Sequence, residues 1–169
     1  MVRAAIALGS NLGDREAALR EGVQALRGAA RGAGTASALG NALEHVLLNV
    51  RVSSVHETAY VGAGAPQPPY LNAAATADTS LPARALLDLL LGIEDRFGRE
   101  RPYPDAPRTL DLDLILYGMD ILDAPGLIVP HPRFRQRRFV LAPLAEIAAD
   151  WIDPVTGRTI DELLRVLDA

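Results

Sequence analysis

Two aspartates, Asp111 and Asp113, interrupt an otherwise apolar run that ends at Tyr117. Successive side chains of a β-strand point to opposite faces, so a strand here places both carboxylates on one face. The opposite face then carries a row of leucines: Leu110, Leu112, Leu114 and Leu116. Because such a row has to be buried, the pattern predicts a core strand with a paired-carboxylate face.

The two carboxylates constrain what can lie beside that strand. Like charges held a few ångströms apart repel each other and are unfavourable near a packed core, unless a cation binds between them or the strand opens to water. Carboxylate oxygens next to an arginine, here Arg108, suit Mg²⁺ bound together with a phosphate-containing substrate. The alternative is a strand whose outer face is simply solvated.

Length and composition favour one globular domain. The chain has 169 residues, of which 49% are hydrophobic, so it is long enough for one well-buried domain and short for two. It contains no cysteine, which excludes disulfides, thiolate metal sites and cysteine nucleophiles and is consistent with a reducing compartment. No leader-like segment follows Met1 and no apolar run approaches about 18 residues, so we expect a cytoplasmic protein without membrane contact.

All 17 basic residues are arginine. The absence of lysine excludes a P-loop lysine, a Schiff-base lysine and a Ser-Lys pair, so any phosphate chemistry has to use arginine. The net charge of −4 argues against a nucleic-acid-binding surface, because binding to a phosphate backbone is driven by clustered positive charge. Nucleic acid is therefore not an expected partner.

Hydrophobic periodicity and turn residues predict the order strand, helix, strand, strand, helix, strand. The segments are residues 4–8, 14–27, a stretch within 47–55, 70–79, a helix that Ser80 caps and Gly98 ends, and the strand of the two aspartates. This order is the split βαβ arrangement. The expected fold class is therefore α+β, with a ferredoxin-like βαββαβ core in which helices pack on an antiparallel sheet.

Beyond this core the sequence predicts additional strands and helices at the C-terminus. Short strands are expected at residues 121–122 and 127–129 and a helix over 140–147, and a capping box of Thr159 and Glu162 begins the last helix. Residues 28–43 are rich in small residues and show no period, which is typical of a flexible insertion. We expect one domain over residues 1–169 that contains this insertion.

Four short motifs are spread along the chain. They are Ala-Leu-Gly-Ser-Asn-Leu-Gly-Asp at 7–14, Tyr-Leu-Asn-Ala-Ala at 70–74, Pro-Arg-Thr-Leu-Asp-Leu-Asp at 107–113 and Val-Pro-His-Pro-Arg at 129–133. With these motifs in this order, nearly the whole chain resembles the 6-hydroxymethyl-7,8-dihydropterin pyrophosphokinase family of folate biosynthesis. The motif at 107–113 is highly specific in that context.

The resemblance implies an ATP-dependent transferase that moves the β,γ-pyrophosphoryl group of ATP to the hydroxymethyl oxygen of the pterin and releases AMP. It implies two Mg²⁺ ions held by Asp111 and Asp113, between the triphosphate and the substrate hydroxyl. Arg99 and Arg101 would join the aspartates as catalytic residues, since an arginine fork bonds phosphate oxygens in pairs. Either Asp113 or water would accept the hydroxyl proton.

The resemblance also implies two sets of binding residues. The ATP-binding set is Glu94, Arg99, Arg101, Arg108, His131 and Arg137. The pterin-binding set, in which two aromatic rings sandwich the pterin and an amide reads its edge, is Thr58, Val61, Tyr70, Asn72 and Phe139. Without the family, the same residues have plainer interpretations: a solvated charge face for the arginines, a surface helix charge for Glu94, a capped loop for His131 and core packing for Phe139.

Two departures from the family pattern lie close to the predicted site. Asp105 and Ala106 precede the motif at 107–113, where many relatives have an aromatic or other residue followed by glycine. Ala59 and Tyr60 follow Thr58, where relatives often have prolines. We expect these changes to affect loop closure over the substrates rather than the metal chemistry.

The resulting expectation is a monomeric enzyme whose partners are two small molecules, ATP and hydroxymethyl-dihydropterin. Two other classes stay open from the sequence. One is a ferredoxin-like sensor or nucleic-acid-binding module without catalysis, although an RNA-binding sheet needs exposed aromatic residues. The other is a degenerate enzyme that binds ATP but no longer reacts.

Overall fold

β1 (Val2–Ser10) is the central strand of the sheet in the computed structural model, which describes residues 1–29, 47–60, 62, 65–98 and 106–169. It pairs antiparallel with β4 (Tyr70–Thr79) along one edge and with β5 (Asp111–Tyr117) along the other. Alanines make up much of β1 and β4, and most residues of both strands are buried. Such short side chains allow helices to pack closely on both faces of the sheet.

Two shorter strands complete the sheet on the far side of β4. β2 (Leu47–Val52) and β3 (His56–Thr58) both pair antiparallel with β4. The order across the sheet is therefore β2 or β3, then β4, β1 and β5, with all neighbours antiparallel. This order confirms the predicted ferredoxin-like core, in which β2 and β3 together take the place of the second strand.

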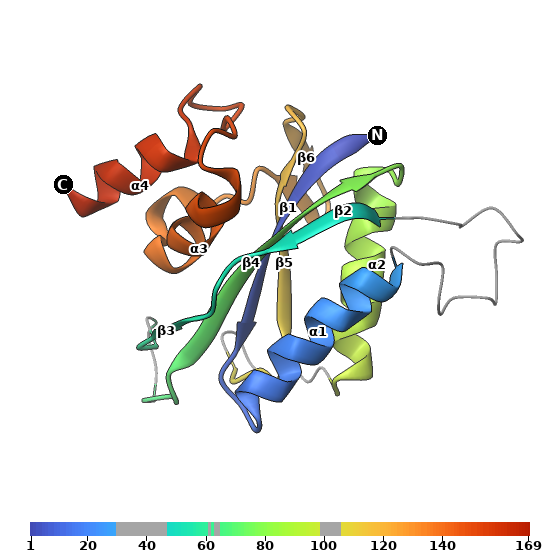
Figure 1. Ribbon diagram of the computed structural model, residues 1–169, viewed down its shortest axis with the longest axis vertical. Helices are drawn as coiled ribbons and strands as arrows, with labels where there is room; N and C mark the ends of the chain where they lie inside the picture. The colour runs from blue at the N-terminus through green and yellow to red at the C-terminus, as the bar shows by residue number, and fades with distance from the viewer. Residues whose placement is uncertain (30–46, 61, 63–64, 99–105) are drawn as a thin grey trace, which may run out of the picture.

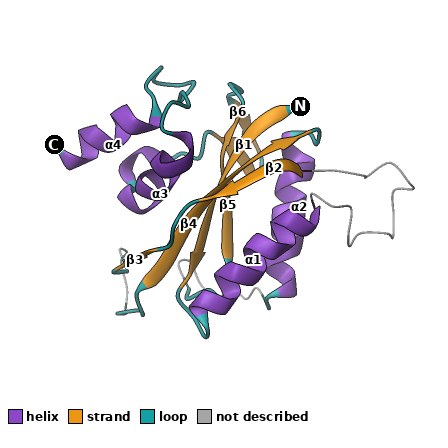
Figure 2. Ribbon diagram, viewed as in Figure 1, coloured by secondary structure: helices purple, strands orange, loops and turns teal. Residues whose placement is uncertain are grey.

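Helices cover both faces of the sheet (Figure 1). α1 (Arg15–Ala29) and α2 (Ala83–Arg96) pack on one face, where their leucines form a hydrophobic cluster with Ile6 of β1. α3 (Arg138–Ala148) lies over the opposite face, and α4 (Ile160–Asp168) packs beside it. Figure 2 shows the strands as the middle layer between the two pairs of helices.

Short elements connect β5 to α3. β6 (Leu122–Ala124) and β7 (Leu127–Val129) pair as a small antiparallel ribbon, and the 3-10 helix η1 (Phe134–Gln136) follows. Phe134 of η1 is fully buried in the cluster beneath α3. This buried ring anchors the segment that leads from β7 into α3.

A β-bulge in β5 changes which side chains face each layer. Ala5 of β1 pairs with Leu116, whereas Ile6 pairs with Leu114, so Ile115 is an extra residue. An extra residue reverses the alternation beyond it. Ile115 and Leu116 therefore both pack on the α3 side, and the prediction that Leu116 shares the face of Leu114 is wrong.

The other predicted helices and strands of the core are present, with differences at their ends. α2 begins after Pro82, which occupies the N-cap position without a side-chain cap, so the prediction that Ser80 caps this helix is wrong. Gly98, with φ of 68°, ends α2 as predicted. The predicted insertion at 28–43 begins inside α1, and its remainder lies within residues 30–46, outside the described residues.

The predicted capping box at the last helix is confirmed. The Glu162 backbone N–H donates to Thr159 Oγ1 at 3.2 Å, and the Thr159 N–H donates to the Glu162 carboxylate at 2.8 Å. Over the part of the chain that the structure describes, none of the helices combines the length and the apolar character needed to span a bilayer.

We expect Phe134→Ala to lower the free energy of unfolding by about 3–5 kcal/mol, because it removes a fully buried ring and leaves a cavity under α3. Urea denaturation measures this loss. Val155→Ala is a matched control, since its side chain is exposed and the change should be close to neutral. A loss for Phe134→Ala as small as that of the control would contradict the packing described for this face.

Candidate active site

Three strand ends meet at one place on the α3 face of the sheet. Because β1 is antiparallel to both neighbours, its C-terminal end lies beside the N-terminal ends of β4 and β5. Gly9 is opposite Asn72 on one side and opposite Asp111 on the other, and Ala7 is opposite Asp113. These residues line a cavity of about 230 Å³, to which the start of α3 also contributes.

Each of the two aspartates of β5 has an arginine nearby. Arg108 Nη1 lies 2.6 Å from Asp111 Oδ1, and Arg137 Nη1 lies 4.0 Å from Asp113 Oδ2. Burial alone would lower the pKa of Arg108, but the charge of Asp111 and its hydrogen bond raise that pKa. The predicted pair of carboxylates on one face is confirmed, and the arginines offset its charge.

Asn11, which the sequence analysis did not single out as a site residue, places the Arg108 segment beside β1. Its backbone N–H donates to the Arg108 carbonyl at 3.0 Å, and its Oδ1 accepts the Arg108 N–H at 2.9 Å. Its Nδ2 donates to Gln67 Oε1 at 2.9 Å and to the Pro68 carbonyl at 3.3 Å. The available sequence signal was an asparagine directly after a strand, in the first motif.

Glu94 lies on the opposite side of the sheet from the cavity and does not line it. Its side chain is 1% exposed, and its Oε1 accepts the Leu112 backbone N–H at 2.7 Å. The alternative of a surface helix charge is therefore wrong. Because Leu112 separates the two aspartates, Glu94 holds the edge strand β5 at the point where it presents them.

His131 lies beside two arginines at the mouth of the site. Burial, followed by the charges of Arg137 and Arg133, lowers the pKa of His131 to about 4. Its Nδ1 accepts the Arg133 backbone N–H at 3.2 Å, which leaves the proton of the neutral ring on Nε2. At neutral pH this side chain is therefore an uncharged hydrogen-bond donor.

Aromatic and amide side chains form the other half of the cavity. Tyr70 and Asn72 come from β4, Thr58 from β3 and Phe139 from the first turn of α3. Asn72 Nδ2 donates to Thr58 Oγ1 at 2.7 Å. The guanidinium carbon of Arg137 lies 5.5 Å from the centre of the Phe139 ring, which connects this half to the charged half.

A sequence model of the 7,8-dihydro-6-hydroxymethylpterin-pyrophosphokinase family matches residues 5–149. The chain belongs to this family. The matched range runs from within β1 to just past the end of α3, and it contains all the described residues that line the cavity.

Pyrophosphokinase relatives agree with this assignment. A 2-amino-4-hydroxy-6-hydroxymethyldihydropteridine pyrophosphokinase of Bacillus subtilis is 41% identical over 158 residues, which are 93% of this chain and 84% of that protein. The enzyme of that name from Synechocystis is 51% identical over 105 residues, which are 62% of this chain and 54% of that protein. The match thus spans about half of the Synechocystis protein.

Solved structures support the pyrophosphokinase fold. HPPK abbreviates 7,8-dihydro-6-hydroxymethylpterin-pyrophosphokinase. A crystal structure of an HPPK-DHPS in complex with substrates superposes on this chain with a TM-score of 0.66 at 10% sequence identity, and the superposition covers 98% of this chain and 43% of that one. Wild-type HPPK-DHPS of Plasmodium falciparum gives the same TM-score at 11% identity, covering 98% of this chain and 44% of that one. At sequence identities this low, the superposition shows only that the folds are similar.

Most of the family site residues predicted from the sequence converge on the cavity. Those that line it are Thr58, Tyr70, Asn72, Arg108, Asp111, Asp113, His131, Arg137 and Phe139. Val61, Arg99 and Arg101 lie outside the described residues, so their roles stay predictions. Arg133, which the sequence analysis did not select, also lines the cavity, and its signal was the final position of the Val-Pro-His-Pro-Arg motif.

The donor set of the cavity fits the magnesium ions that the family implies. Asp111 and Asp113 offer hard carboxylate oxygens from a rigid strand, which suits Mg²⁺. Within the described ranges no group of three or more histidine, cysteine, aspartate or glutamate side chains could hold a metal. The two aspartates would therefore share such an ion with phosphate oxygens and water, which Mg²⁺ tends to keep.

We expect the His131 ring to titrate at about pH 4 in the ligand-free protein, well below the ordinary value of 6.5. Because the unfolded chain binds this proton at higher pH than the folded chain, the free energy of unfolding should decrease as the pH falls from 6.5 towards about 4. Histidine NMR resonances followed against pH measure the titration, and His131→Gln identifies the signal. Titration near 6.5 would contradict the buried, arginine-flanked position of the ring.

Proposed function

We propose that this chain transfers the β,γ-pyrophosphoryl group of ATP to the hydroxymethyl oxygen of 6-hydroxymethyl-7,8-dihydropterin and releases AMP. The proposal is carried by one cavity that has two halves. In the charged half, Asp111 and Asp113 face Arg108 and Arg137. The other half consists of aromatic and amide side chains, among them Phe139. Charged and aromatic halves suit a triphosphate and a flat polar ring, respectively. Membership of the pyrophosphokinase family supports the same reaction.

The proposed reaction is a displacement at the β-phosphorus of ATP. The pterin hydroxymethyl oxygen forms a bond to that phosphorus, the bond to the oxygen that bridges the α- and β-phosphorus breaks, and AMP leaves with this oxygen. The hydroxyl proton passes to Asp113 or to water. Catalysis of this kind depends on alignment of the two substrates and on offsetting the charge of the transferring group.

Asp111 and Asp113 would hold magnesium, and we propose two ions. When bound, Mg²⁺ aligns the attacking and leaving oxygens and offsets negative charge on the phosphates. The protein keeps both carboxylates on the cavity side through the β1–β5 pairing and the bond from Leu112 to Glu94. A negatively charged pair without such ions would repel a triphosphate.

Arg108, Arg137 and His131 would bind phosphate oxygens. Arginine remains charged and offers paired donors, whereas neutral His131 donates from Nε2 without adding to the repulsion among the arginines. Arg99 and Arg101, the family arginines outside the described residues, complete the proposed set. Glu94 acts on this site indirectly: it accepts the Leu112 N–H and so holds β5, rather than contacting a ligand in the cavity.

The pterin ring would lie between Tyr70 and Phe139, with its polar edge towards Asn72 and Thr58 and beside Val61. Aromatic faces exclude water from both sides of a flat heterocycle, and the amide supplies hydrogen bonds in the plane of the ring. We propose a monomeric enzyme of one domain whose partners are these two small molecules, as the family resemblance implies, and the cytoplasm stays its predicted location.

Asp113→Asn should reduce AMP formation by more than about 100-fold, because it removes a charged magnesium ligand while it keeps the shape of the side chain. Nucleotide products are followed with Mg²⁺, ATP and the hydroxymethyl pterin. Asp120→Asn is the control, since Asp120 is exposed beyond the other end of β5. Formation of ADP in place of AMP, or no turnover by the parent protein, would reject the reaction, and ATP binding without turnover would indicate a degenerate enzyme.

Phe139→Leu should raise the KM for the pterin by about 5- to 150-fold, which corresponds to the 1–3 kcal/mol typical of stacking on an aromatic ring. The KM for ATP should stay within about twofold, because leucine preserves the apolar packing beside Val140. Steady-state kinetics with each substrate varied in turn separate the two constants. Equal changes in both constants would contradict a stacking role.

A further inference from the structure

The strand next to the pterin half of the cavity is interrupted. β2 ends opposite Ala75 and β3 begins opposite Asn72, so three residues of this edge face two residues of β4. Ser53 keeps the pairing at the break: its N–H donates to the Ala74 carbonyl at 2.9 Å, and its Oγ accepts the Ala74 N–H at 2.8 Å. The extra residue is a bulge, and its geometry determines where β3 resumes along β4.

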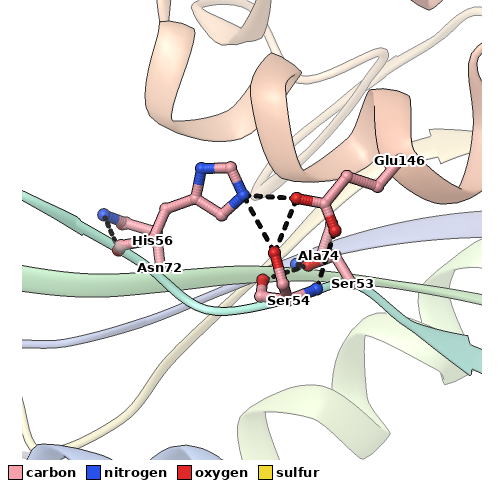
Figure 3. A network of polar contacts seen from close by, with 6 residues as sticks. All are labelled: Ser53, Ser54, His56, Asn72, Ala74 and Glu146. Atoms are coloured by element: carbon pink, nitrogen blue, oxygen red, sulfur yellow. Dashed lines mark hydrogen bonds and ion pairs between the residues drawn. The ribbon is translucent and has the colours of Figure 1, made fainter.

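A carboxylate from α3 holds this bulge in place (Figure 3). Glu146 Oε2 accepts the Ser54 backbone N–H at 2.8 Å, and its Oε1 accepts the Ser54 hydroxyl at 2.7 Å and lies 2.5 Å from His56 Nε2. Hydrogen bonds from Ser54, then from His56, lower the pKa of Glu146, so the carboxylate is charged at neutral pH. The network joins α3 to the edge of the sheet.

The same three residues do not form a hydrolytic site. In a serine nucleophile triad, one ring nitrogen of histidine takes the proton of the serine and the acid binds the other nitrogen. Here Glu146 and the Ser54 hydroxyl both lie at Nε2 of His56, the hydroxyl at 3.3 Å. The Ser54 hydroxyl also donates to the carboxylate itself, so its role is to hold Glu146.

The strand held by this network sets the amide of Asn72. Asn72 Nδ2 donates to Thr58 Oγ1 at 2.7 Å and to the His56 carbonyl at 3.5 Å, and both acceptors belong to β3. With both amide protons directed at β3, Oδ1 is the atom that Asn72 offers to a ligand. A pterin edge carries amino and ring N–H donors, which match an acceptor of this kind.

The network also sets the distance across the pterin pocket. Phe139 and Glu146 are about two turns apart on α3, so they project from the same side of the helix. Phe139 and Thr58 both line the cavity, and Glu146 contacts His56, the first residue of the strand β3 that carries Thr58. The position of β3, which carries Thr58, therefore depends on the position of α3, which carries Phe139.

We infer that Glu146 is a positioning residue for the pterin substrate, which acts by holding the Ser54–His56 bulge so that β3 orients the Asn72 amide and fixes the width of the pocket. This inference rests on the proposed function, because it assigns the Asn72 half of the cavity to the pterin. Glu146 itself does not line the cavity.

Three variants test the role. Glu146→Ala should raise the KM for hydroxymethyl-dihydropterin about fivefold to tenfold, with kcat and the KM for ATP within about twofold, as expected for the loss of hydrogen bonds to a partly exposed charge. Ser54→Ala should give a smaller rise, because the Ser54 N–H still reaches the carboxylate. Glu146→Gln should restore the parent KM, since its amide can accept the Ser54 N–H and donate to the Ser54 hydroxyl.

Glu57→Gln is the matched control. Glu57 is next to His56 on β3, but its carboxylate pairs with Arg15 at 3.3 Å, away from the network. Its kinetic constants should equal those of the parent. An unchanged pterin KM in Glu146→Ala, or equal rises in both KM values with a lower melting temperature, would overturn the positioning role.

A second measurement needs no turnover. In the ligand-free protein, the side-chain NH₂ resonances of Asn72 should shift in Glu146→Ala and stay in place in Glu57→Gln, because only the first change releases the strand that accepts these protons. Unmoved Asn72 resonances would overturn the inference even if the parent protein forms no AMP. Absence of AMP from the parent protein, with shifted Asn72 resonances, would instead reject only the proposed reaction.

Discussion

The antiparallel pairing of β1 with β4 and β5 is the constraint on which the rest of the site depends. It places Gly9 between Asn72 and Asp111, so the residues proposed to recognise a ring and those proposed to hold magnesium and phosphate lie one strand away on either side. A shift of one residue would turn either set to the opposite face of the sheet. Burial of Ile6 and Leu8 against the helices beneath holds this register.

Three arginines, Arg108, Arg133 and Arg137, line the cavity together with the two aspartates, so the charge of the carboxylates is offset before any substrate binds. Arg108 and Arg137 offset the two aspartates, and His131 adds no charge because burial and the neighbouring arginines keep it neutral. In the proposed reaction, these internal ion pairs are replaced by contacts of the same side chains with the triphosphate and its cations. Such an exchange requires little net change in the charge of a partly buried site, where uncompensated charge is unfavourable.

The sheet is irregular on both sides of the site, and each irregularity has a consequence there. The bulge at Ile115 follows Asp113, so the aspartates stay on the cavity face while Leu116 is turned into the core beneath α3. The break between β2 and β3 exposes backbone and side-chain donors of Ser54, which Glu146 accepts. Regular strands would present neither arrangement.

The sequence by itself determined what depends on near neighbours: the order of the elements, the shared face of Asp111 and Asp113, the capping box of Thr159 and the family motifs. The tertiary structure alone decided the face of Leu116, the burial of Glu94, the low pKa of His131 and the contact of Glu146 with Ser54, which is 92 residues away. Periodicity and caps are set within a few residues along the chain. Burial, bulges and charge contacts depend instead on which distant segments the folded sheet brings together.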